Sequence, residues 1–142
     1  MNEKAKERET MSEETSKGFW DDAEVIYAYT RAQAIEDGVL VDVSGLAKEA
    51  GFKYPVALTA TVYGKYVEVP EGVIAQDETG RLWDILFMLR LAAKRGGDTL
   101  LFQLHVRNDN SDRTPPLVTL KAVCGPGGQG EPVITIMLPD ED

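Results

Sequence analysis

The chain has 142 residues, 43% of them hydrophobic, which is the size and apolar content of one ordinary domain with a buried core. Its 24 acidic and 15 basic side chains give a net charge of −9, which disfavours direct binding to nucleic acid or to an anionic membrane and favours a basic partner. No segment has the roughly 18 to 20 consecutive apolar residues of a membrane helix, the N-terminus lacks a secretory-signal pattern, and the single cysteine excludes an internal disulfide. We therefore expect a cytoplasmic protein.

The N-terminal residues 1–17 are predicted to form a flexible charged tail, and residues 18–142 a single domain. Five glutamates and four basic residues occupy the tail, with no aromatic side chain. Such a composition buries too little apolar surface to offset the entropy of ordering.

The block after the tail predicts a strand, a short helix and a second strand. Val25–Tyr29 is rich in strand-forming residues, and Val39–Val43 reads as another extended segment. Between them Thr30 stands where a helix N-cap would, and Gly38 where a C-cap would.

Two further segments precede the main helix. Ser44 is placed to cap a second short helix that ends at Gly51. Residues Val56–Val67 are predicted to be a helix or a pair of short irregular pieces, with Gly64 interrupting the second half.

The segment Arg81–Arg95 gives the clearest helical pattern in the chain. Leucine, isoleucine and alanine recur at helical spacing, and Trp83 with Phe87 widens the apolar stripe almost to a full circle. We expect a central helix that packs on more than one side and ends at Gly96.

The last third of the chain changes to the alternating pattern of strands. Leu100–Arg107, Leu117–Cys124 and Val133–Leu138 predict an antiparallel β-meander, with the main helix across its apolar face. The predicted class is α+β, with short helices and strands in the N-terminal part, and the Val25 and Val39 strands are candidates for the same sheet.

Three patterns resemble chemical motifs, and each has a structural explanation. His105 and Cys124 are expected about 20 Å apart along neighbouring strands, too far for a nucleophile–base pair. The run Gly125–Gly130 matches a dinucleotide motif but leads into a strand instead of a helix. Asn108–Asp112 begins like a calcium loop but lacks its glycine and its final glutamate. The sequence therefore assigns no metal, no cofactor and no catalytic residue, although an enzyme that uses isolated acids stays open.

The remaining candidates are polar and aromatic residues in apolar surroundings. Arginine beside exposed tyrosine or tryptophan is typical of an interface hot spot. The competing interpretation is an internal network of ion pairs and helix caps that locks the short segments to the main helix. The candidate interaction residues are Tyr27, Tyr29, Arg31, Gln33, Asp77, Arg81 and Trp83.

Three segments also carry a resemblance to a known family. They read FWDDAEVIYAYTRAQAIEDGVLVDVS from Phe19, QDETGRLWDILFMLR from Gln76, and VTLKAVCGPG followed by PVITIMLPDED in the C-terminal part. The chain resembles an uncharacterised family of small acidic bacterial proteins that are often encoded on plasmids, integrative elements and phages. The resemblance implies a genetic setting and no activity.

Charge, size and this implied setting together favour a noncatalytic protein-binding module of a mobile genetic element. Its partner would be a basic or nucleic-acid-handling protein, such as a host defence nuclease of the CRISPR or restriction type. Imitation of a DNA duplex is less favoured because the acidic residues are scattered among lysine and arginine residues. Two alternatives stay open: a small enzyme or binding protein for a nucleotide or metabolite, and an accessory protein of plasmid or phage maintenance that acts as a homodimer.

Overall fold

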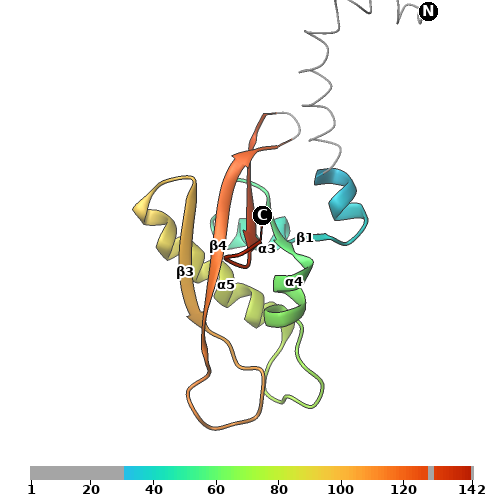
Figure 1. Ribbon diagram of the computed structural model, residues 1–142, viewed down its shortest axis with the longest axis vertical. Coiled ribbons are helices and arrows are strands. Elements are labelled where there is room, and N and C mark those ends of the chain that lie inside the picture. Colours follow the sequence, from blue (N-terminus) through green and yellow to red (C-terminus); the bar gives the residue numbers. More distant parts are fainter. Residues whose placement is uncertain (1–30, 128–129, 142) are drawn as a thin grey trace, which may run out of the picture.

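The structure is a computed structural model, in which residues 31–127 and 130–141 are described (Figure 1). The predicted tail at residues 1–17, the predicted strand Val25–Tyr29 and the predicted cap Thr30 lie outside the described residues. A helix spans residues 31–36 and stops before Gly38, whose φ of 83° is the left-handed conformation expected of a C-terminal glycine.

A five-stranded sheet forms the centre of the fold, in the order β1-β2-β5-β4-β3. Its strands are β1 (Leu40–Asp42), β2 (Val56–Thr59), β3 (Thr99–His105), β4 (Leu117–Pro126) and β5 (Pro132–Met137). The pairs β3–β4 and β4–β5 are antiparallel, which confirms the predicted meander. The pair β2–β5 is parallel and joins the N-terminal strands to the meander, so the sheet is mixed and the class is α+β.

The prediction for Val56–Val67 was wrong in its first half. Residues Val56, Ala57 and Leu58 are fully buried in β2, between β1 and β5. A buried strand reads as a short continuous apolar run, and periodicity cannot separate such a run from a buried helical segment. After β2 the chain forms one turn of helix, α4 (Ala60–Val62), and a π-helical turn, η1 (Tyr63–Val67).

The second short helix is present as α3 (Ser44–Glu49), but Ser44 does not cap it. The Ser44 hydroxyl donates to Asp42 Oδ1 at 2.6 Å and accepts from the Val56 backbone N–H at 3.1 Å. The side chain therefore holds α3 to β2. The predicted end of α3 is confirmed by Gly51, which has a φ of 103°.

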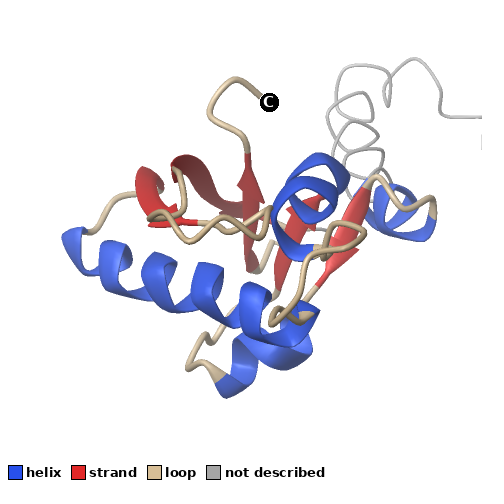
Figure 2. Ribbon diagram, turned by 90° about the horizontal axis from the view of Figure 1, so that it is seen from below, coloured by secondary structure: helices blue, strands red, loops and turns tan. Residues whose placement is uncertain are grey.

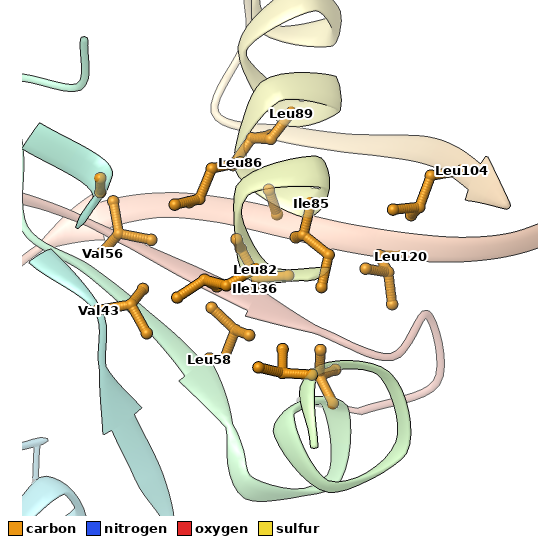
Figure 3. Close-up of a cluster of buried hydrophobic side chains, with 14 of the residues drawn as sticks. Val43, Val56, Leu58, Leu82, Ile85, Leu86, Leu89, Leu104, Leu120 and Ile136 are labelled. Carbon is orange, nitrogen blue, oxygen red and sulfur yellow. The ribbon is translucent and has the colours of Figure 1, made fainter. Parts of the chain in front are cut away.

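The main helix is α5 (Glu78–Ala92), continued by one 3₁₀ turn, η2 (Ala93–Arg95). It lies across one face of the sheet (Figure 2). Leu82, Ile85, Leu86 and Leu89 point from α5 toward the sheet, where they pack with side chains of the strands and of the loop before α3 (Figure 3). As expected, α5 packs on more than the sheet, since it also contacts η1 and α3. Its outer face is open, because Phe87 is 50% and Leu91 43% exposed.

Candidate interaction surface

The side of α5 that faces away from the sheet carries three large apolar side chains. Trp83, Phe87 and Leu91 follow one another at intervals of four residues, and their exposed fractions are 38%, 50% and 43%. Residues four apart in a helix are neighbours on one face, so these three form a continuous strip, here called the outer strip. A row of exposed aromatic and leucine side chains is typical of a contact surface in a soluble protein.

An open groove of about 700 Å³ continues the outer strip toward the sheet. Met88, Leu91 and Ala92 line it from α5, and Leu101 and Phe102 line it from β3. Leu91 therefore belongs to both the outer strip and this groove, which we call the edge groove. Leu101 is 52% exposed, so the apolar surface runs from the outer strip across the edge groove to the outermost strand.

Arg81 lies in the first turn of α5, on the buried side of the helix, and only 6% of its surface is exposed. Its guanidinium donates to the backbone oxygen of Val67 at 3.1 Å and to the backbone oxygen of Arg107. It also donates to Gln76 Oε1 at 3.2 Å and to Asn108 Oδ1 at 2.6 Å. All four acceptors are uncharged, and burial lowers the pKa of Arg81 from its ordinary value.

The Arg81 contacts tie α5 to three segments: η1, the loop that joins η1 to α5, and the β3–β4 connection, which is distant in sequence. Asn110 adds a second tie, because its side-chain amide accepts from the Ile74 N–H at 2.9 Å and donates to the Gly72 oxygen at 2.9 Å. Figure 1 shows both loops at the same end of the molecule. These contacts support the internal-network interpretation for Arg81, whose side chain cannot reach a partner.

Asp77 caps α5, since its carboxylate accepts from the Gly80 N–H at 3.0 Å. Asp84 lies about two turns further along and lines a small polar hollow with Arg81 and His105. Asp84 is exposed on one side, and partial desolvation at this hollow raises its pKa from the ordinary value. The entry to α5 is thus a structural capping site, and of the three candidates at this entry only Trp83 presents a large exposed apolar side chain.

The described candidates of the N-terminal block, Arg31 and Gln33, lie in the helix of residues 31–36, which contacts the middle strand of the sheet, β5. Arg31 donates to Thr135 Oγ1 at 2.8 Å and to the Ile134 oxygen at 3.4 Å, which fixes the helix of residues 31–36 to β5. Gln33 donates to Asp37 Oδ1 at 2.8 Å within the same helical turn. Tyr27 and Tyr29 lie outside the described residues. The structure therefore does not bring Arg31 and Gln33 together with Asp77, Arg81 and Trp83.

Phe87, Leu91 and Leu101 were missing from the sequence-based candidates. The spacing of Trp83, Phe87 and Leu91 was the available signal, but the nearly continuous apolar circle of α5 made it look like core packing. The signal for Leu101 was its place directly before Phe102 in the alternating strand pattern. Successive side chains of a strand point to opposite faces, so Leu101 lies on the face of the sheet that Phe102 does not occupy.

The resemblances to chemical motifs find structural explanations. His105 pairs with Leu117 at one end of the β3–β4 ladder, while Cys124 lies beyond Thr99↔Val123 at the other end, so the two side chains are far apart. The His105 ring donates through Nδ1 to the Pro115 oxygen at 2.7 Å. The glycine-rich run forms the connection between β4 and β5, which are antiparallel strands. The loop at Asn108–Asp112 uses its polar side chains for the ties to Arg81 and to Gly72.

Across residues 31–127 and 130–141, no group of three or more histidine, cysteine, aspartate or glutamate side chains is arranged to hold a metal ion. In the same part of the chain no helix is long and apolar enough to cross a membrane. Comparison with curated proteins and with solved structures gives no significant match. A family model does match residues 16–142, and the chain belongs to this family, the family of unknown function DUF6573.

Proposed function

We propose that the protein is a noncatalytic module that binds another protein through the outer strip. The observation that carries the proposal is the exposure of Trp83, Phe87 and Leu91 in one row on α5, continued by the edge groove. Aromatic side chains supply most of the binding energy in many interfaces, because they bury a large apolar area at a low cost in conformational entropy. In the free protein the same row is exposed to water, which is unfavourable unless a partner covers it.

The net charge of −9 supports a basic partner, since long-range attraction raises the rate of encounter between oppositely charged proteins. The resemblance to small acidic proteins of plasmids, integrative elements and phages gives this proposal its setting. We accordingly propose an inhibitor of a host defence protein that handles nucleic acid, of the CRISPR or restriction type. The charge and the surface belong to this chain, whereas the setting comes from the resemblance.

The test compares the capture of host proteins by the tagged wild-type protein and by two variants. The double substitution Phe87→Ser and Leu91→Ser removes the centre of the outer strip. The control is Val39→Ser, which removes another exposed apolar side chain, 59% exposed, next to β1 at the opposite edge of the sheet. Each captured protein is quantified, purified and titrated against all three forms.

We expect the double substitution to weaken binding of the purified partner by a factor of about 30 or more, which corresponds to the loss of about 2 kcal/mol at a hot spot. Val39→Ser should leave the affinity within about twofold, because isolated surface substitutions have small effects. Equal affinity of all three forms would place the binding surface elsewhere. Turnover of a nucleotide by the purified protein, with no captured partner, would replace the binding function by an enzymatic one.

A further inference from the structure

Among the described residues, the outermost strand, β3, has an unpaired edge. Its neighbour β4 is on one side, and β3 is the last strand in the order of the sheet. The bonds from Cys124 N–H to the Asp98 oxygen and from Val106 N–H to the Pro116 oxygen show that the even-numbered residues bond to β4. In an antiparallel ladder the backbone groups alternate in direction, so the N–H and C=O groups of Thr99, Leu101 and Gln103 point away from β4.

This edge has little protection. Within residues 31–127 and 130–141, Arg95 is the one side chain that bonds an outward group of β3: it donates through Nη2 to the Leu101 oxygen at 2.8 Å. Soluble proteins usually shorten, cover or charge such an edge, because a row of free backbone groups is a template for another strand. The strand β3 is seven residues long and carries Leu101, 52% exposed, in its middle.

The edge groove lies directly beside these free backbone groups. Met88, Leu91 and Phe102 form its apolar wall. In a strand added to β3, every second side chain would point toward the α5 side of the sheet, as Leu100, Phe102 and Leu104 do. Those side chains would enter the edge groove, and the side chains between them would lie beside Leu101 on the other face.

The charge at the groove selects among possible strands. Arg95 is the charged residue of the lining, and Lys94 precedes it in η2, whereas no acidic side chain lines the groove. This local charge is opposite to the net charge of the chain. A segment with a carboxylate near Arg95 would gain an ion pair when its backbone N–H replaces Arg95 at the Leu101 oxygen.

We propose that β3 accepts an extended segment of a partner protein as an added strand, with apolar side chains at alternate positions in the edge groove and a carboxylate against Arg95. This inference rests on the proposed function and specifies how the partner is recognised. Backbone hydrogen bonds to the edge would supply affinity, and the edge groove would supply specificity. A second copy of the chain fits less well, because it would bring another set of Arg95 and Lys94 side chains and another charge of −9 to the same interface.

The experiment selects short linear peptides from a phage-displayed library against the immobilised protein and measures the binding of synthetic versions. We expect the selected peptides to alternate apolar and polar residues and to contain aspartate or glutamate. When a peptide binds, the exchange of the Leu101 and Gln103 amide protons with solvent, followed by NMR, should slow by a factor of about ten or more. Selection with Arg95→Glu should enrich lysine and arginine instead.

A matched pair of substitutions tests the strand pairing. Gln103→Pro removes an outward N–H and leaves the ladder to β4 intact, because proline is tolerated at the free side of an edge strand. Gln103→Thr keeps this N–H, and both substitutions remove the bond from the Gln103 side chain to Thr119 Oγ1. We expect a loss of affinity of about tenfold or more for the proline variant and about twofold or less for the threonine variant. The wild-type exchange measurement decides the matter if the proline variant does not fold.

Three outcomes would overturn the proposal. Equal binding of the proline and threonine variants, with unchanged exchange at Leu101 and Gln103, would show that the partner does not pair with β3. Slowing of the same amide exchange with rising protein concentration, together with a dimer in light scattering, would assign the edge to a second copy. Failure to select any peptide would also reject an extended segment as the ligand. The proposed function would survive each of these results if Phe87→Ser with Leu91→Ser still abolished capture of a host protein.

Discussion

The buried guanidinium of Arg81 offers the sharpest test of what holds this fold together, through the substitution Arg81→Met. Methionine keeps much of the aliphatic volume of the side chain but removes all four side-chain hydrogen bonds. The acceptors Gln76 and Asn108 can turn toward water. The backbone oxygens of Val67 and Arg107 cannot turn away, and the bond to Val67 is buried.

A buried acceptor that loses its partner costs about 1 to 3 kcal/mol. Two such acceptors give an expected loss of about 2 to 6 kcal/mol in the free energy of unfolding, a large part of the about 5 to 15 kcal/mol of a typical domain. Urea unfolding followed by circular dichroism would measure this loss. The control is Arg113→Met in the β3–β4 connection, where the side chain is exposed and the expected change is within about 0.5 kcal/mol. A loss below about 1 kcal/mol for Arg81→Met would refute the assignment of Arg81 as the tie between the three segments.

Three further predictions concern single residues and use the same unfolding measurement. Asp77→Ala should destabilise the protein by about 1 kcal/mol, because it removes the acceptor of the Gly80 N–H, while Asp77→Asn should stay close to wild type. Equal stabilities of the two variants would show that the side chain of residue 77 does not stabilise the protein as a helix cap. Ala75 has a φ of 62°, so Ala75→Gly should raise the stability by about 0.5 to 1 kcal/mol and Gly72→Ala, at a φ of 85°, should lower it by about 1 kcal/mol; the opposite signs would contradict the backbone argument. Because desolvation raises the folded-state pKa of Asp84, the folded protein holds a proton there more tightly than the unfolded chain does. The free energy of unfolding therefore falls as the pH rises from the ordinary aspartate pKa of 3.8 through the raised folded-state pKa. Asp84→Asn should therefore stabilise the protein at pH 7 relative to wild type, with a gain that vanishes below the ordinary aspartate pKa of 3.8; a gain that does not depend on pH would exclude the ionisation of Asp84 as its cause.

The elements with a long, regular pattern were predictable. The helix α5 was expected at Arg81–Arg95 and spans Glu78–Ala92 with its 3₁₀ continuation, and β3, β4 and β5 follow the predicted meander. Short segments were less predictable. The four residues of β2 carry no period, and their place between β1 and β5 depends on strand pairings that are distant in sequence.

The candidate site was only partly predictable. Trp83, one of the predicted contact residues, is 38% exposed, but Arg81, two positions before it, is buried, and its partners Val67 and Arg107 come from other segments of the chain. Asp77 lies at the start of α5, as expected, and its side chain caps this helix. Phe87 and Leu91 looked like core residues because the sequence pattern does not say on how many sides a helix is covered.

The sequence by itself determined the α+β class, the long helix and the meander, because periods of 3.6 and 2 follow from the backbone geometry of helices and strands. It also determined the net charge and the family. Only the tertiary structure decided which apolar side chains remain in water, since this depends on the sheet covering one side of α5 and leaving Trp83, Phe87 and Leu91 on the other. The free edge of β3 was decided there too, because the order of strands is set by long-range pairing, which leaves no local signal in the chain.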